Sequence, residues 1–362
     1  MKIAVIGAGA WGTALASLFA RSSEVTLYSG NHDLVHSIEQ GRENRRYLPG
    51  VVLSDSVQIT DSLVDALRAV SGVVLAVPTR GLRRTIKACQ ELHGDSAPYL
   101  VTCKGFEVGS GLLPFQVIQE VLPKARYAIL SGPSFAKDVG FGKPTIVSLA
   151  SSEESSAAVF SGLLLRGGMR TYFNQDLIGV SMGGAGKNVI AIAAGMSDAL
   201  GSGASALAGL VTRGLSEISR VGVALGGKPQ TFMGLSGMGD LALTCFSDLS
   251  RNRRLGQALG EGKSVAEAET ALGQVAEGIH AANEIKALAI RLEVEVPITT
   301  AVTRVLSNEI SPDEAAKEFT AFERDRDDDD DDDGALGDGE RRGTTKVCGG
   351  CVRVTNLRKT RV

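Results

Sequence analysis

Residues 2–12, KIAVIGAGAWG, decide the fold. The apolar, partly β-branched run at their start predicts a buried strand, which the glycines then end. Gly7, Gly9 and Gly12 give the spacing GxGxxG between that strand and a helical pattern over 13–20. In this context the first glycine permits a tight turn, the second lets the backbone approach a pyrophosphate, and the third permits close helix–sheet packing. The stretch predicts a dinucleotide-binding turn, with a plain tight turn as the alternative.

Short apolar strands recur along the first half of the chain. We predict them at 22–29, 71–78, 98–105 and 126–133, with helical patterns at 81–92 and 112–122 between them. Continuous apolar strands that alternate with helices are typical of a parallel sheet buried on both faces. We therefore predict an α/β, doubly wound Rossmann-type domain over residues 1–174.

The pattern changes after residue 174. Segments rich in Ala, Leu and Gly follow with helical periodicity and no evident strand, at 183–200, 205–227, 250–262, 264–272 and 281–292. We predict an all-helical substrate and catalytic domain over 175–323.

The last part, 324–362, has a different composition. Asp327–Asp333 are seven consecutive aspartates, and the charge then reverses to lysines and arginines. Such a run repels itself, so we predict a disordered tail. Cys348 and Cys351 have CxxC spacing without a second pair or a nearby His, so we interpret them as free thiols rather than a zinc site.

Removal of this tail is expected to leave catalysis intact, because no functional motif is found beyond about residue 322. A chain that ends at Phe322 should keep its kcat and its melting temperature. Loss of most activity in that shortened chain, with its circular dichroism unchanged, would mean that the tail completes the site.

Composition narrows the function classes. The 362 residues carry a net charge of −3, so no basic field attracts nucleic acid or anionic lipid. No apolar run reaches the roughly 18 residues of a membrane span. The N-terminus lacks a signal-peptide pattern, and the five cysteines form no disulfide framework. We expect a cytoplasmic protein without membrane insertion, a nucleic-acid partner or a metal.

Polar residues follow two of the predicted strands. Lys104 comes at the end of one, and Gly132 and Ser134 follow another. Ligands of open α/β sheets bind outside the carboxyl ends of the strands. Lys104 therefore suits an anionic substrate, although an ordinary surface lysine is the alternative.

Lys187 and Asn188 lie among glycines and alanines at the start of an apolar helix. This is an unusual setting for a surface lysine. Partial desolvation lowers the pKa of an ammonium group, which suits it to acid–base catalysis. A structural lysine is the alternative.

Two further segments bear polar groups. Asp240 follows a glycine-rich turn, and Thr244 lies one helical turn later. Ser250–Arg254, with the sequence SRNRR, forms a basic cluster, and arginine binds phosphate in a bidentate manner. A solvated, capped helix start would explain the cluster equally well.

The end of the second strand distinguishes NAD from NADP in this fold. An acid there holds the ribose 2′-hydroxyl, whereas a nearby arginine accepts a 2′-phosphate. Ser29 and Gly30 supply neither group. We predict weak discrimination with NADP preferred over NAD, and Arg45 and Arg46 are the candidates for a phosphate contact.

In this order, the motifs resemble the bacterial-type NAD(P)-dependent glycerol-3-phosphate dehydrogenase family over residues 1 to about 322. The motifs that carry the resemblance are GAGAWGTALA (7–16), NRRYLPG (44–50), VVLAVP (73–78), KG (104–105), SGPSFA (131–136), GGAGKNVIAIAAGMSD (183–198), TRGLSEISR (212–220), TFMGLSGMGDLALTC (231–245), SRNRR (250–254) and GQVAEG (273–278). The resemblance implies interconversion of sn-glycerol 3-phosphate and dihydroxyacetone phosphate with NAD(P)(H). It also implies that the product supplies glycerophospholipid synthesis.

The resemblance implies that Lys187 is the proton donor and acceptor, and we expect Asp240 to orient it and Lys104 to lower its pKa. The predicted substrate contacts are Lys104, Gly132, Ser134, Asn188, Asp240, Thr244, Ser250, Arg251 and Asn252. The predicted cofactor contacts are Gly7, Gly9, Ala10, Trp11, Gly12, Ala136, Arg251, Val275 and Glu277.

The chain departs from the family pattern at a few positions. Ser205 and Leu207 replace an Asn and an Arg, Ser181 replaces an acid or amide, and Gly186 replaces a larger residue. We expect these departures to alter the packing around each position and the catalytic efficiency.

Two other functions stay open at this stage. A β-hydroxyacid dehydrogenase would share the organisation, although SRNRR favours a phosphorylated substrate. A catalytically dead nucleotide-binding regulator would not need Lys104, Lys187 and Asp240. The sequence leaves a homodimer open as well.

Overall fold

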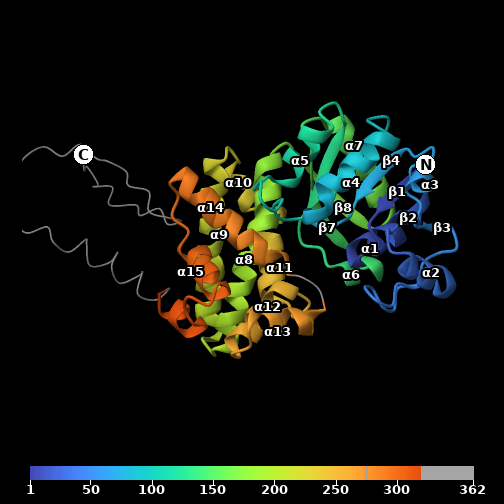
Figure 1. The fold of residues 1–362 in the computed structure, drawn as a ribbon. Coiled ribbons are helices and arrows are strands. Elements are labelled where there is room, and N and C mark those ends of the chain that lie inside the picture. Colours follow the sequence, from blue (N-terminus) through green and yellow to red (C-terminus); the bar gives the residue numbers. More distant parts are fainter. Residues whose placement is uncertain (274–275, 319–362) are drawn as a thin grey trace, which may run out of the picture.

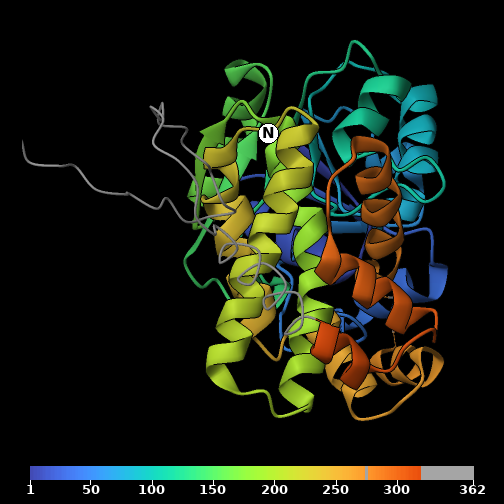
Figure 2. The same cartoon turned by 90° about the vertical axis from the view of Figure 1, so that its left-hand side faces the viewer.

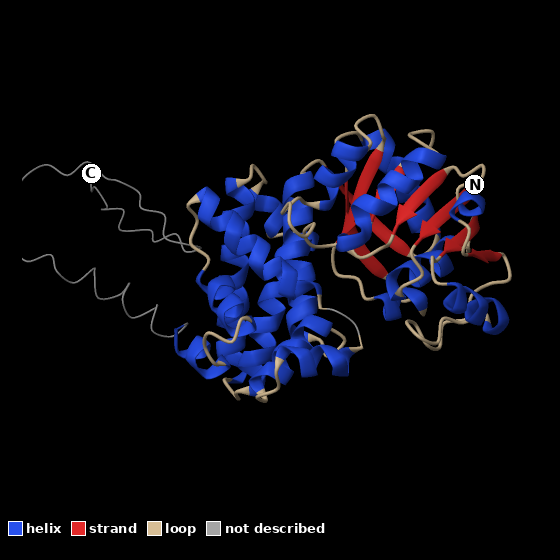
Figure 3. Ribbon diagram, in the orientation of Figure 1, coloured by secondary structure: helices blue, strands red, loops and turns tan. Residues whose placement is uncertain are grey.

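A computed structural model describes residues 1–273 and 276–318 (Figure 1). All strands lie in one half of this part of the chain, and the other half is helical (Figure 3). The predictions for the tail, including those for Cys348 and Cys351, fall outside the described residues.

One sheet of eight strands has the order β3-β2-β1-β4-β5-β6-β7-β8. The strands are β1 (Lys2–Ile6), β2 (Glu24–Tyr28), β3 (Val57–Thr60), β4 (Gly72–Leu75), β5 (Tyr99–Val101), β6 (Tyr127–Ser131), β7 (Thr145–Ala150) and β8 (Met169–Asn174). All neighbours are parallel except β6 and β7, which are antiparallel. The doubly wound Rossmann-type prediction is confirmed, with one antiparallel step added to the predicted parallel sheet.

Helices cover both faces of the sheet. They are α1 (Ala10–Phe19), α2 (His32–Gly41), α3 (Leu63–Ala66), α4 (Thr79–Leu92), α5 (Pro114–Val121), α6 (Ala136–Gly140) and α7 (Glu154–Arg166). The apolar residues of α1, α2 and α7 form one core with the sheet, whereas α3, α4 and α5 belong to a second core. This second core continues into the helical half, so the two halves are joined by apolar packing.

Several predicted strands are longer than the observed ones. β4 ends at Leu75, β5 at Val101 and β6 at Ser131. The residues that follow, including Lys104 and Ser134, therefore lie in loops at the carboxyl edge of the sheet. This is where the fold places its ligands.

The helical half is built around α8 (Leu177–Ala199). The other elements are α9 (Gly203–Ala224), α10 (Pro229–Phe232), the π-helix η1 (Leu235–Gly239), α11 (Asp240–Phe246), α12 (Arg251–Gly260), α13 (Val265–Leu272), α14 (Glu277–Leu292) and α15 (Pro297–Leu306). Figure 2 shows α8 and α9 side by side. By length and composition α8 would span a membrane, but 89% of its apolar window is buried inside the protein, as in a core helix. The predicted boundary at residue 174 falls between β8 and α8 and stays a prediction.

Local packing explains two of the departures from the family pattern, Gly186 and Leu207. A Cβ added at Gly186 would lie 2.7 Å from Ile218 Cγ1, so Ile218 occupies the space that a larger residue would need. Leu207 is buried in the core of the helical half, whereas Ser205 is exposed. Ser181 is buried with no hydrogen-bond partner for its hydroxyl, for which we have no structural reason.

Candidate active site

The glycine-rich turn has the shape that a pyrophosphate needs. Gly7 has a φ of +115°, and an added Cβ would lie 2.7 Å from the carbonyl oxygen of Ala76. An added Cβ at Gly12 would lie 1.8 Å from the carbonyl oxygen of Gly7, whereas the space beside Gly9 is open. No side chain caps α1, so the backbone N–H groups of its first turn, at Ala10 and Trp11, are available to an anion. These residues fit a dinucleotide.

Asn44 ties a neighbouring loop to this turn. Its Nδ2 donates to the carbonyl oxygen of Ala8 (2.9 Å) and to Thr13 Oγ1 (2.8 Å), and the side chain is fully buried. The loop thereby holds the exposed Arg45 and Arg46 close to the turn. The motif NRRYLPG contained Asn44, but its anchoring role was not predicted.

An acidic residue, Asp61, directly follows β3 and lies beside the end of β2. His32 Nδ1 is 2.5 Å from Asp61 Oδ2, and this hydrogen bond raises the pKa of His32. The side chain of His32 is exposed. Sequence reasoning missed Asp61 because β3 was not predicted, so the residue that follows it could not be placed beside Ser29.

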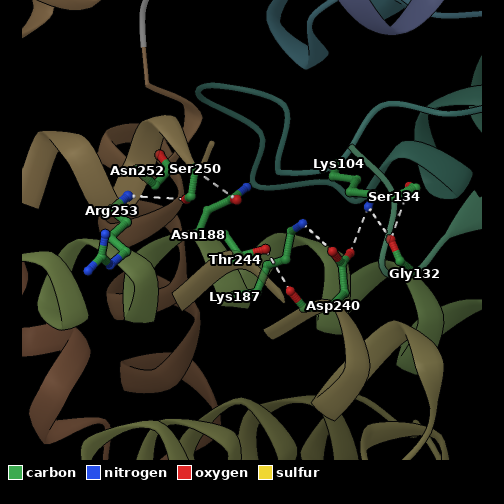
Figure 4. A network of polar contacts seen from close by, with 10 residues as sticks. All are labelled: Lys104, Gly132, Ser134, Lys187, Asn188, Asp240, Thr244, Ser250, Asn252 and Arg253. Carbon is green, nitrogen blue, oxygen red and sulfur yellow. Dashed lines mark hydrogen bonds and ion pairs between the residues drawn. The ribbon is translucent and has the colours of Figure 1, made fainter. Parts of the chain in front are cut away.

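Three elements bring Lys104, Lys187 and Asp240 together (Figure 4). Lys187 Nζ is 2.5 Å from Asp240 Oδ1, and Lys104 Nζ is 2.6 Å from Asp240 Oδ2. Asp240 is fully buried and Lys187 is 8% exposed. The loop after β5, α8 and α11 supply one residue each, so this cluster lies where the two halves of the protein meet.

The environment of Lys187 favours loss of its proton. Burial, together with the positive charge of Lys104, lowers the pKa of Lys187 to about 8, although the carboxylate of Asp240 acts in the opposite direction. An ammonium group with this pKa can donate or accept a proton near neutral pH. These are the contacts that the predicted roles of Asp240 and Lys104 require, and the roles themselves stay predictions.

The π-helix η1 packs against α8 and places Asp240, the residue that follows it, beside this helix. An added Cβ at Gly237 would lie 2.0 Å from the carbonyl oxygen of Phe232, and one at Gly183 would lie 2.4 Å from that of Ser236. The turn therefore depends on close backbone contacts that only glycine permits. Such π-turns often mark functional sites.

The loop after β6 and the start of α11 supply further predicted contacts. Lys104 Nζ and Ser134 Oγ both donate to the carbonyl oxygen of Gly132, at 3.0 and 3.1 Å. Thr244 Oγ1 donates to the carbonyl oxygen of Asp240 (2.6 Å), so its hydroxyl hydrogen is used within α11. Ala136 begins α6, and Val275 lies outside the described residues.

Asn188 and Asn252 join α8 to α12. Asn252 Nδ2 donates to Asn188 Oδ1 (2.9 Å), and Asn252 Oδ1 accepts from the backbone N–H of Gly278 (3.0 Å). The Ser250 side chain caps α12 by accepting from the backbone N–H of Arg253 (3.2 Å). The start of α12 thus faces the same region as Lys187, as Figure 4 shows.

Thr79, at the start of α4 in the sheet half, and Glu277, at the start of α14 in the helical half, lie near each other beside the site. Burial raises the pKa of Glu277, while Arg251, the backbone N–H of Thr79 and Lys187 act in the opposite direction. Thr79 Oγ1 also donates to the carbonyl oxygen of Lys104 (3.3 Å). Thr79 was missed, although its position directly after the VVLAVP motif was a signal for it.

The structure therefore gathers the predicted substrate residues around Lys187 and the predicted glycines at the start of α1. Among residues 1–273 and 276–318, no group of His, Cys, Asp or Glu could hold a metal ion. The residues bring a desolvated lysine, a second positive charge and a glycine-rich turn that fits a dinucleotide to one edge of the sheet.

Comparison with known families matches both halves of the chain. The profile described as NAD-dependent glycerol-3-phosphate dehydrogenase N-terminus matches residues 2–157, and the corresponding C-terminus profile matches residues 176–317. The chain is 48% identical to glycerol-3-phosphate dehydrogenase [NAD(P)+] of Dechloromonas aromatica over 322 residues, which cover 89% of this chain and 98% of the relative. It is 44% identical to the enzyme of the same name from Nitrosomonas europaea, with 88% and 97% covered.

A solved structure gives the same result. The crystal structure of glycerol-3-phosphate dehydrogenase from Coxiella burnetii aligns with a TM-score of 0.85 and 38% identity. The alignment covers 88% of this chain and 98% of the Coxiella chain.

Proposed function

The chain belongs to the NAD-dependent glycerol-3-phosphate dehydrogenase family, and on that premise we propose how its own residues carry the reaction. It is an NAD(P)-dependent oxidoreductase that interconverts sn-glycerol 3-phosphate and dihydroxyacetone phosphate. The single observation that carries the site assignment is the buried Lys104–Asp240–Lys187 cluster at the carboxyl edge of the sheet.

The backbone of the glycine-rich turn and the first turn of α1 hold the pyrophosphate, with Gly9 leaving room for it. When bound, the nicotinamide supplies the hydride for reduction or takes it up in oxidation. The remaining contacts to the cofactor come from Trp11, Ala136, Arg251 and Glu277. Val275 completes this proposed set.

Lys187 handles the proton. As hydride reaches the carbonyl carbon of dihydroxyacetone phosphate, the oxygen gains negative charge and needs a proton, which the Lys187 ammonium donates. This ammonium binds the developing oxyanion more strongly than the ground-state carbonyl, which is the condition for catalysis. Asp240 orients Lys187, and Lys104 adds positive charge beside it.

The phosphate of the substrate lies at the start of α12. Arg251 and Asn252 bind it, with Ser250 beside them at the N-terminus of the helix. Fixing the phosphate there would hold the substrate carbonyl beside Lys187, so that the reaction proceeds from an oriented complex. Asn188 is hydrogen-bonded to Asn252 and follows Lys187 on α8, so it connects the phosphate-binding residues to Lys187.

One assay tests this function against its rivals. Addition of dihydroxyacetone phosphate should consume the absorbance of NADPH or NADH. A β-hydroxyacid dehydrogenase would instead oxidise unphosphorylated hydroxy acids, and a nucleotide-binding regulator would turn over neither. Oxidation of the reduced cofactor only with unphosphorylated substrates would overturn the assignment of the phosphate site.

The proposed cofactor preference is NADP(H) over NAD(H). Arg45 and Arg46, which Asn44 holds beside the glycine-rich turn, support it. The acidic Asp61 and the absence of an arginine at Gly30 keep this preference for NADP(H) small. We expect a higher kcat/KM for NADPH than for NADH, and the R45Q/R46Q double variant should lower only the value for NADPH. A preference of the unaltered protein for NADH above about tenfold, or roughly 1.4 kcal/mol, would reverse the assignment.

We also propose that the enzyme works in the cytoplasm and supplies sn-glycerol 3-phosphate to glycerophospholipid synthesis. The family membership and the reducing direction of the reaction support this role. A homodimer stays a hypothesis, and the molar mass of the particle measured by light scattering decides it.

A further inference from the structure

Arg253 differs from the other arginines of the SRNRR cluster. Arg251 and Arg254 are exposed, whereas the side chain of Arg253 keeps only 10% of its surface accessible. Successive residues of a helix are rotated by about 100°, so Arg253 leaves α12 on nearly the opposite side from Arg251. The sequence groups these arginines as one basic cluster, but the structure separates them.

The guanidinium of Arg253 joins two carboxylates. Its Nη2 donates to Asp198 Oδ2 (2.8 Å) near the end of α8, and its Nη1 donates to Asp248 Oδ1 in the loop before α12. Gln257 Nε2 also donates to Asp198 Oδ2 (2.9 Å). Because two carboxylates balance its charge, Arg253 is not available to bind the substrate phosphate itself.

These contacts hold α12 against α8, the helix that carries Lys187. Lys187 and Asp198 are eleven residues apart on α8, which is about three turns or roughly 16 Å, so they share one face. α12 is held near one end of this stretch by the hydrogen bond between Asn252 and Asn188, and near the other by the Arg253–Asp198 pair.

Between these two points the backbones of α8 and α12 touch. An added Cβ at Gly195 would lie 2.0 Å from the carbonyl oxygen of Arg253, and one at Gly256 would lie 2.0 Å from that of Ile192. The two helices therefore cross with no side chain between them. The side chain of Arg253 also joins the loop before α12 to this crossing through Asp248 and Asp198.

We propose that Arg253 is a positioning residue: by bridging Asp198 and Asp248 it holds the first turn of α12 so that Ser250, Arg251 and Asn252 meet the substrate phosphate. The proposal rests on the proposed function, because it takes Arg251 and Asn252 as the phosphate ligands. A misplacement of about 1 Å in such a grip can cost on the order of 10²-fold in rate.

Arg253→Gln tests this role. We expect the KM for dihydroxyacetone phosphate to rise about 10- to 100-fold, with kcat changed far less. The affinity for sn-glycerol 3-phosphate, measured by calorimetry, should fall by a similar factor. For dihydroxyacetone, which lacks the phosphate, kcat/KM should stay unchanged, a result that general damage to the site would not give.

A matched control exists on α15. Arg304 also lies between two carboxylates, Glu318 (2.5 Å) and Glu309 (4.0 Å), but it is not part of α12 or α8. Arg304→Gln removes a comparable charge and should leave the KM unchanged. Asp248→Asn is the milder companion of Arg253→Gln, because Asp248 is 87% exposed and the buried Arg253 keeps its second carboxylate, Asp198. It should raise the KM several-fold in a folded protein, even if Arg253→Gln fails to fold.

The outcomes distinguish the phosphate assignment of Arg251 from the positioning role of Arg253. If Arg251→Ala leaves the KM unchanged, the phosphate assignment itself is wrong. If Arg251→Ala raises the KM but Asp248→Asn and a folded Arg253→Gln do not, only the positioning role is overturned. Equal losses of kcat/KM for dihydroxyacetone phosphate and dihydroxyacetone would also overturn it.

Discussion

Lys187→Ala is expected to lower kcat for the reduction of dihydroxyacetone phosphate at least about 10²-fold, the usual contribution of a positioned acid. Hydride transfer to the carbonyl would then leave an oxyanion without the proton that Lys187 supplies. The affinity for NADPH, measured by fluorescence titration, should stay near normal, because Lys187 lies on α8 and not on the glycine-rich turn. Lys263→Ala, at an exposed lysine paired with Glu261, is the control.

The pH dependence gives the same prediction a second readout. Reduction needs protonated Lys187, so kcat/KM for dihydroxyacetone phosphate should fall as the pH rises through about 8, the pKa to which burial and Lys104 lower this group. Oxidation of sn-glycerol 3-phosphate needs the neutral amine and should rise over the same range. Both limbs should be absent in Lys187→Ala. Near-normal kcat in that variant would make Lys104 the leading proton donor.

The parts of the fold that the sequence predicts correctly are those with a strong local signal. β1 and the start of α1 follow from an apolar run and a glycine spacing, and α8 from a long apolar helix pattern. β3 and β8 were missed for a physical reason, whereas β7 (TIVSLA) is mostly buried and was missed without one. VQIT and MRTYFN alternate apolar and polar residues or face solvent at a sheet edge, so no continuous apolar run marks them.

The candidate site shows the same division. Lys104, Lys187 and Asp240 were selected from separate local signals: a strand end, a stretch of small apolar residues and a glycine-rich turn. They are far apart in sequence, and only tertiary packing brings both lysines onto one carboxylate. The two roles of the SRNRR arginines could not be separated either, because which of them is buried depends on the contact of α12 with α8. Asn44 acts through contacts to a distant segment, the carbonyl oxygen of Ala8 and Thr13 Oγ1, which no spacing rule predicts.

Asp240→Asn is expected to lower kcat for dihydroxyacetone phosphate by about 10- to 100-fold near neutral pH, and to move the pH profile to lower pH. Asp240 lies 2.5 Å from one ammonium and 2.6 Å from the other, and its carboxylate opposes the lowering of the Lys187 pKa by burial. Asparagine keeps the size of the side chain but removes the negative charge. The pKa of Lys187 should then fall below its present value of about 8, so that more of the lysine is neutral at neutral pH and cannot act as an acid.

This cause is specific enough to be checked, because activity lost through deprotonation returns when the pH is lowered, whereas activity lost through misfolding does not. The kcat of Asp240→Asn should therefore recover toward that of the unaltered enzyme as the pH falls, until the stability of the protein limits the assay. Asp65→Asn, which breaks an exposed pair with Arg68, controls for the loss of one carboxylate. Breaking a buried pair can cost about 3–5 kcal/mol, so the melting temperature is measured alongside. A folded Asp240→Asn protein with reduced kcat but an unshifted pH profile would show that Asp240 only holds the lysines in place, and that burial and Lys104 alone set the proton affinity of Lys187.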